Sequence, residues 1–323
     1  MSRFRCSLRV FGALAVMLGA VSACGGGGND GARIPALDLQ PHDFAPADLS
    51  TPEAVMRAAA AMPLAGQPLL LSADPAARVC DQGGSRSRED GEAPEMNGPF
   101  EREPGEPLNR FTRWGFNGCR TTSVPGALSG VVTRFCGADD ECQTTQVTVL
   151  GEGETPVLDA HTLFGASTAR YVLRGQHYRF QSGGEQKRQV VGLVAGQSIA
   201  DPANPGRTFV GFAGETPTPL TVSRMGASIM VSGPYGLHDE GTSLCLNGAV
   251  SVETLTPLVA EAGSAGEPNR YSQGRLRFTN RNGDIAVLQL GADQASDAVI
   301  EIDGQQTLVS AHQLRVALPE CWR

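Results

Sequence analysis

The feature that most constrains the fold of this chain is a series of short β-prone runs separated by turn residues. The segment Arg275–Phe278 alternates arginine with an apolar residue, as a strand does when one face is buried and the other meets water. The dipeptides Asn282-Gly283 and Asp303-Gly304 each stand between two such runs, and both favour a two-residue hairpin turn. Spacing of this kind predicts antiparallel strands that follow one another along the chain.

The same pattern of runs and turns extends over most of the chain. The expected strands are Leu128–Phe135, Thr144–Leu150, Ala169–Phe180, Gln189–Val194, Thr208–Phe212, Leu220–Arg224, Ser228–Ser232, Leu244–Leu255, Arg275–Thr279, Ile285–Leu290, Ala298–Ile302 and Thr307–Leu318. We therefore predict a mainly β fold, built as an antiparallel sandwich or as a curved meander sheet.

One short N-terminal helix is expected before the strands, within residues 51–68. Thr51 can cap this helix, and Pro52 suits its first turn. The segment Ala54–Met62 supplies strong helix formers, and Pro63 and Gly66 are expected to end the helix.

The segment that follows the first β-prone residues has a different composition. Residues 86–107 carry many prolines, glycines and acids, including Glu89 and Asp90, and almost no apolar side chains. This composition predicts a long surface loop, because such a segment offers little apolar area to bury.

The first two dozen residues have the pattern of a secretory signal peptide. Arginines precede the apolar run Val10–Ala20, which is too short to span a membrane. The tetrapeptide Val21-Ser22-Ala23-Cys24 that follows resembles the lipobox of bacterial lipoproteins. The resemblance implies cleavage before Cys24 and acyl chains on its thiol and new N-terminus, which together hold a protein stably to a bilayer. An ordinary signal peptide with a coincidental cysteine is the alternative.

The lipobox resemblance also implies a location and a domain order. Gly25 follows Cys24 where enteric lipoproteins kept in the inner membrane carry Asp, which favours an outer-membrane anchor with the body facing the periplasm or the cell surface. We expect a signal peptide at 1–23, a lipidated flexible tether at 24–50, the helical segment at 51–68 and a β-rich body at 69–323. The body is either one domain or two modules, about 69–150 and 151–323.

The cysteines of the mature chain are consistent with export. Of the eight cysteines, Cys6 is removed with the signal peptide and Cys24 takes the lipid. An even number remains, which predicts disulfides in an exported protein. The disulfide candidates are Cys80, Cys119, Cys136, Cys142, Cys245 and Cys321. The sequence leaves their connectivity open, although proximity favours Cys80 with Cys119, Cys136 with Cys142 and, by elimination, Cys245 with Cys321.

The net charge restricts the partners. The whole chain has 26 basic and 34 acidic residues, and removal of the signal peptide makes it more acidic still. Binding to nucleic acid needs a basic surface, so we expect no nucleic-acid partner.

The sequence offers little that indicates catalysis. The segment nearest to a serine nucleophile elbow, Gly196–Ala200, lacks the second glycine, and the five histidines have no metal-ligand spacing. Trp114 with Phe111 and Phe116 could stack on a sugar, but core packing beside Cys119 is the simpler interpretation. We therefore expect no catalytic residue, no metal ligand and no cofactor.

The C-terminal part of the chain carries a second resemblance. The segments Gly274–Phe278, Asn282-Gly283-Asp284 and Val299–Gly304 resemble a β-meander of uncharacterised Gram-negative envelope lipoproteins. The resemblance implies no activity. We expect a lipid-anchored envelope protein with a binding or structural role, whose partners are the membrane and an envelope protein or glycan. The alternatives are an exported enzyme that acts on envelope glycan, peptide or lipid, and a surface adhesin.

Overall fold

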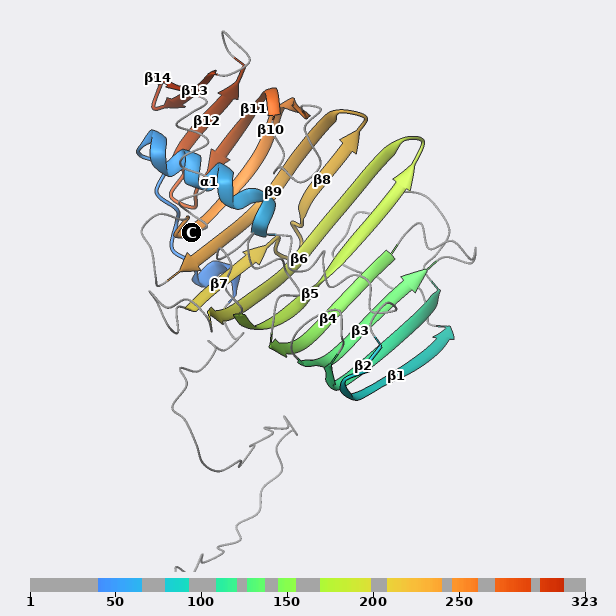
Figure 1. Cartoon of the computed structure of the whole chain (residues 1–323). Coiled ribbons are helices and arrows are strands. Elements are labelled where there is room, and N and C mark those ends of the chain that lie inside the picture. The colour runs from blue at the N-terminus through green and yellow to red at the C-terminus, as the bar shows by residue number, and fades with distance from the viewer. Residues whose placement is uncertain are drawn as a thin grey trace, which may run out of the picture. The chain divides into compact units, whose positions relative to one another are not determined.

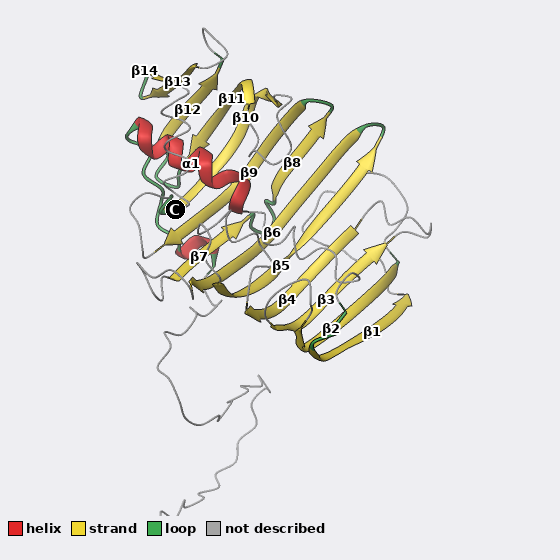
Figure 2. Ribbon diagram, in the orientation of Figure 1, coloured by secondary structure: helices red, strands yellow, loops and turns green. Residues whose placement is uncertain are grey.

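The described part of the chain is mainly β with a single α-helix, as the alternating runs predict (Figures 1 and 2). The computed structural model describes residues 40–65, 79–92, 109–120, 127–136, 145–154, 169–198, 208–239, 246–260, 271–291 and 297–310. All of these residues belong to one unit, Ala32–Arg323.

Fourteen strands form one antiparallel sheet. The strands are β1 (Gly83–Glu92), β2 (Arg110–Arg120), β3 (Ala127–Cys136), β4 (Thr145–Glu154), β5 (Ala169–Ser182), β6 (Glu185–Ser198), β7 (Thr208–Ala213), β8 (Leu220–Met225), β9 (Ser228–Asp239), β10 (Gly248–Ala260), β11 (Tyr271–Thr279), β12 (Ile285–Leu290), β13 (Asp297–Ile302) and β14 (Gln305–Ser310). Apart from β8, each strand lies beside its neighbours in the chain, so the sheet is a meander.

The meander is interrupted at β7 and β8, which share one place in the sheet. The first half of β6, Glu185–Val190, pairs with β8, and the second half, Gly192–Gln197, pairs with β7. On the other side, β9 also pairs with both. Residues 214–219 connect the two short strands through a bridge between Glu215 and Thr218. One strand position is therefore filled by two strands with a loop between them.

The helix α1 (Pro52–Ala65) begins as predicted. The amide of Ala54 donates to Thr51 Oγ1 at 3.2 Å, so Thr51 caps the first turn. Of the two residues expected to end the helix, Pro63 does not, because α1 continues to Ala65, and Gly66 lies outside the described residues. Because proline has no backbone amide, the helix passes Pro63 with the loss of one backbone hydrogen bond, the one that residue 63 would donate to the carbonyl of Ala59.

The main core lies between α1 and one face of the sheet. Figure 1 shows α1 lying across the strands from β9 to β13, and the alanines on its inner face, such as Ala58, are buried. Tyr235 of β9 is fully buried beneath the helix and donates its hydroxyl to the carbonyl of Ala58 at 2.6 Å. Phe278 of β11 and Ile300 of β13 are equally buried in this core.

A smaller apolar cluster covers the opposite face. Phe212 and Ala213 are adjacent in β7, so their side chains point to opposite faces. Ala213 joins the core under α1, whereas Phe212 joins Phe44, with the two rings 4.9 Å apart and tilted edge to face. Both faces of the sheet are thus apolar at this point.

The two Asx-Gly turns behave differently. Asp303-Gly304 forms the predicted two-residue turn, because Ile302 pairs with Gln305 and both turn residues have positive φ. The same prediction is wrong for Asn282-Gly283, since Thr279 pairs with Ile285 and five residues make the connection.

The prediction of a loop over residues 86–107 is wrong for its first part. Residues 86–92 lie in β1, which pairs with β2 along its length, and neither strand was predicted. Residues 93–107 lie outside the described residues. Polar residues can form this strand because it lies at the edge of the sheet and buries almost nothing.

Two of the expected domain boundaries can be compared with the described residues. The tether was expected to reach residue 50, but Phe44, Ala47 and Leu49 are buried against the sheet. The boundary considered near residue 150 falls inside β4, whose two neighbours β3 and β5 pair with it without a break. The described strands therefore continue as one sheet across that boundary.

Candidate functional site: the N-terminal strap

The first described residues after the expected anchor are held firmly against the sheet. We call Gln40–Leu49 the N-terminal strap. It begins with a short 3-10 turn, Pro41–Asp43, in which the amide of Gln40 donates to Asp43 Oδ2 at 2.7 Å. At the end of the strap, Asp48 Oδ1 accepts the amide of Ser50 at 2.8 Å, and this bond lowers the pKa of Asp48 below its ordinary 3.8. The strap thus leads through two local turns into α1.

The middle of the strap pairs with the start of β10. Pro46 forms a parallel bridge with Ala249, supported by bonds from the Ala47 amide to the Ala249 carbonyl at 2.9 Å and from the Ala249 amide to the Ala45 carbonyl at 2.8 Å. Gly248 makes the close approach possible, because a Cβ at that position would lie 2.7 Å from the Ala45 carbonyl oxygen.

The turn between β11 and β12 holds the strap from the side. Asn280 is buried, and its Nδ2 donates to the Ala47 carbonyl and to Asp284 Oδ2, each at 2.8 Å. Its Oδ1 accepts the amides of Asn282 and Asp284, both at 3.0 Å. One side chain therefore shapes the five-residue turn and binds the strap, which explains why this turn is longer than the dipeptide predicts.

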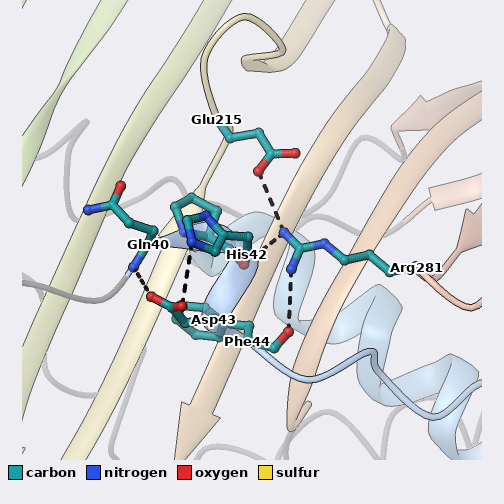
Figure 3. Close-up of polar contacts among 7 residues, drawn as sticks. Gln40, His42, Asp43, Phe44, Glu215 and Arg281 are labelled. Carbon is teal, nitrogen blue, oxygen red and sulfur yellow. Dashed lines mark hydrogen bonds and ion pairs between the residues drawn. The ribbon is translucent and has the colours of Figure 1, made fainter.

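Arg281 completes the attachment (Figure 3). Its guanidinium donates to the carbonyl of Pro41 at 2.8 Å and to that of Phe44 at 3.4 Å. A carboxylate oxygen of Glu215, from the loop between β7 and β8, lies 3.6 Å from Arg281 Nη2. The arginine thus joins three segments that are far apart in the sequence: the strap, the β7–β8 loop and the β11–β12 turn.

The strap passes from one face of the sheet to the other. Phe44 packs on Phe212 in the smaller cluster, whereas Ala47 and Leu49 belong to the core under α1. Since the bridge at Pro46 lies between these residues, the chain crosses at the start of β10. A force applied to the strap would therefore act at the same time on the apolar contacts at both faces of the sheet and on the hydrogen bonds of Asn280 and Arg281.

The polar groups near the start of the strap form an exposed ion pair and contacts that attach the strap to the sheet. His42 Nε2 lies 3.5 Å from Asp43 Oδ1, and both side chains are exposed. The Arg281 guanidinium is occupied by backbone carbonyls and Glu215. The arrangement offers a fixed exit point for the N-terminal chain.

The cysteines predicted to form disulfides are only partly within the described residues. Cys80 is bonded to Cys119, the pairing that proximity favours, and the bond ties the residues before β1 to the end of β2. Cys136, at the end of β3, is also disulfide-bonded. The other predicted sites, Cys24, Cys142, Cys245 and Cys321, lie outside the described residues.

The aromatic residues considered as a sugar platform do not form one. Trp114 and Phe116 are buried on one face of β2, and Phe111, an odd number of positions away, points to the other face. The Arg134 guanidinium carbon lies 5.4 Å from the centre of a Trp114 ring, in cation–π geometry. These residues act in packing, as the simpler interpretation held.

The other candidates can be placed in part. Within the described ranges, no group of three or more His, Cys, Asp and Glu residues is arranged to hold a metal ion. His238 Nδ1 lies 2.8 Å from Asn247 Oδ1, while the side chains of His177 and Ser198 are outside the described set. Among the residues that the structure describes, no helix has the length and apolar character needed to cross a bilayer.

Sequence reasoning missed Asn280 and Arg281. The pattern Asn-x-Asn-Gly-Asp at 280–284 contains a signal for the turn, since an Asn side chain readily bonds the backbone two residues on. Arg281 carries no comparable signal, because its partners are carbonyls 237 and 240 residues earlier in the chain.

Comparison with protein-family models, with curated proteins and with solved structures found no match to this chain.

Proposed function

We propose that this chain is an envelope protein anchored to the outer membrane by lipid on Cys24, and that its sheet acts as a non-enzymatic binding or structural body. The observation that carries the proposal is the N-terminal strap. A body held to a membrane through its N-terminus must transmit force from the anchor to its core without unravelling from that end. The strap supplies the contacts that such a role requires.

The contacts of the strap are spread over its whole length. Arg281 binds the carbonyls of Pro41 and Phe44, the Pro46 bridge follows, and Asn280 binds the carbonyl of Ala47. The two hydrogen bonds of the bridge run across the strap, so tension along the strap would load them across their direction and not one after another. This arrangement supports attachment through the N-terminus.

The distance from the proposed anchor to the strap is limited. Gln40 is 16 residues beyond Cys24, so even a fully extended chain would span about 55 Å at most. Gln40, where the strap begins, would therefore lie within that distance of Cys24.

Metabolic labelling with an alkyne analogue of palmitate tests the anchor. The full chain would be produced in a Gram-negative host as the wild type, as Cys24→Ser and, for a matched control, as Cys6→Ser. We expect label on the wild type and on Cys6→Ser, and only background on Cys24→Ser, since lipid is attached to the Cys24 thiol. Equal labelling of all three proteins, or release of the wild type from membranes without detergent, would contradict the proposal.

Protease treatment of intact cells, beside cells with a permeabilised outer membrane, then tests the side on which the body lies. Protection until permeabilisation supports a periplasmic body with envelope partners. Cleavage on intact cells would favour a surface adhesin instead. An enzymatic role would gain support from a hydrolytic activity on envelope glycan, peptide or lipid that one polar substitution abolishes while the fold is kept.

A further inference from the structure

The strand β1 forms one border of the sheet and is exposed along its length. It pairs with β2, from Gly83 opposite Arg120 to Glu92 opposite Arg110, and its other edge pairs with no strand among the described residues. Every residue of β1 is exposed except Gly91, which is half-buried. The outer edge of a border strand presents backbone amides and carbonyls, the groups to which another strand can bind.

The charges of β1 are ordered, with basic residues first and acidic residues after. On one face the strand presents Arg86, Arg88, Asp90 and Glu92 in succession. Arg88 already binds Asp90 within the strand, with Nε 2.9 Å from Asp90 Oδ2. A sequence of two cations followed by two anions is complementary to itself when read in the opposite direction.

An antiparallel copy of β1 centred on Glu89 uses this complementarity fully. In that register Arg88 stands opposite Asp90 of the copy and Arg86 stands opposite Glu92. A twofold axis perpendicular to the sheet repeats both contacts, so four pairs of opposite charge form on one face. Residues that stand opposite each other are an even number of positions apart in the sequence. The amide and carbonyl groups of both residues therefore point either toward the other copy or away from it, as the hydrogen bonds of an antiparallel pair require.

The axis residue is the one place where like charges meet, and the neighbouring strand compensates for it. Glu89 of each copy would face the other across the axis, on the opposite side of the sheet from the four pairs. Arg113 of β2 stands directly opposite Glu89 in the register, with its Nη1 3.3 Å from Glu89 Oε2. In each copy, Glu89 at the axis therefore has the guanidinium of Arg113 beside it.

Neighbouring registers do not pair every charge on this face with an opposite charge. Moving the axis by one residue places Arg88 against Arg88, or Asp90 against Asp90, on the charged face. Charges on an edge strand ordinarily discourage pairing with arbitrary strands. Here the same charges would discourage every partner except one of matching order. We propose that β1 binds β1 of a second copy of this chain, antiparallel and centred on Glu89, and so joins two sheets into one.

The test combines a cross-link at the axis with exchanged charges, using the full chain produced in a Gram-negative host. A Glu89→Cys variant is treated with a short bismaleimide and compared with Gln306→Cys, an exposed position on β14 at the other end of the sheet. We expect a covalent dimer from Glu89→Cys only. Equal cross-linking of both variants, or no dimer from Glu89→Cys, would overturn the proposal.

Two charge variants, each also carrying Glu89→Cys, then test the register. Arg86→Glu with Arg88→Glu makes the face wholly acidic, and Asp90→Arg with Glu92→Arg makes it wholly basic. We expect either variant alone to cross-link about tenfold less or weaker still, because four pairs become repulsive. Co-production of the two variants should restore the dimer as an acidic–basic pair.

Restoration in the mixture separates binding from folding. A variant that failed because β1 no longer folded could not be rescued by a second damaged variant. Persistent cross-linking of either variant alone, or no recovery in the mixture, would overturn the proposed register. The outcome is independent of lipid on Cys24, because association through β1 needs only two folded copies.

Discussion

The two ends of this sheet are stabilised in different ways although they share one topology. The strands from β9 to β13 lie under α1, and Phe278 and Ile300 are fully buried there. At the other end, β1 is exposed on both faces and is held by the Cys80–Cys119 disulfide and by polar contacts to β2. One of these, the hydroxyl of Thr112 at 2.6 Å from Asp90 Oδ1, is the main cause of the lowered pKa of Asp90.

This difference shows that a meander does not need a uniform core. Each strand contacts chiefly its neighbours in the sheet, so local stability can change from one end to the other, much as in repeat proteins. Apolar burial can sustain the α1 end, while a covalent link and paired charges sustain an edge that stays accessible. Substitutions at the two ends should therefore differ in how much they lower the free energy of unfolding and in how much of the sheet they affect.

The largest effect is expected from Phe278→Ala in the core under α1. Removing a fully buried aromatic side chain should lower the free energy of unfolding by about 3–5 kcal/mol, because it loses apolar burial and leaves a cavity. Urea unfolding followed by circular dichroism measures the change. The matched control is Leu308→Ala on β14, whose side chain is 60% exposed and should cost about 0.5 kcal/mol or less. Similar losses for both variants would refute the distinction between core and edge.

A smaller and more local effect is expected from Cys80→Ser combined with Cys119→Ser. The bond closes a loop with a sequence separation of 39 residues, and its loss should cost about 2–4 kcal/mol. Because the bond acts at β1 and β2, the amides of these strands should exchange hydrogen faster, while those of α1 and β11 should change little. Hydrogen exchange read by mass spectrometry tests this. Loss of protection throughout the sheet would show instead that the two ends unfold as one unit.

The smallest effect is expected from Tyr235→Phe, which removes one hydroxyl from the core under α1. The carbonyl of Ala58 loses its bond from Tyr235, and the free energy of unfolding should fall by about 1 kcal/mol near neutral pH. Thermal or urea unfolding of the two proteins in parallel gives the difference. A loss as large as that of Phe278→Ala would mean that the hydroxyl does more than hold the helix.

The same pair of proteins predicts a dependence on alkaline pH. Burial raises the pKa of the Tyr235 phenol well above its ordinary value of 10.0. Above pH 10 the unfolded chain therefore releases a proton that the folded protein keeps, and stability falls as the pH rises. This contribution is complete below pH 10 and is lost between that value and the folded-state pKa. The advantage of the wild type over Tyr235→Phe should shrink above pH 10, and a constant difference from pH 8 to 11 would argue against a buried, neutral phenol.

The sequence predicted the α1 end of the sheet better than the β1 end. Alternation over Arg275–Phe278 and the Asp303-Gly304 turn are local signals, and both predict what the structure contains. β1 has no apolar alternation, because neither face is buried, so its strand character comes only from pairing with β2. Composition therefore favoured a loop over residues that form a strand.

The strap could not be predicted for a different reason. Its contacts join residues at the start of the chain to Asn280 and Arg281 near the end, and most of them use backbone carbonyls. Carbonyl acceptors are the same at every residue, so the sequence does not mark which ones are bound. Phe44 and Leu49 were the available apolar signals within a segment whose composition otherwise indicated a tether.

The shared place of β7 and β8 has a consequence for how this chain tolerates a change in length. Each short strand has its own register with β6 and β9, so neither depends on the number of residues in the loop that separates them. The residues at the tip of that loop, Thr216–Thr218, are exposed. An inserted peptide would lengthen the tip into solvent and leave both registers in place. The middle of the sheet therefore contains a natural position for grafting a foreign segment.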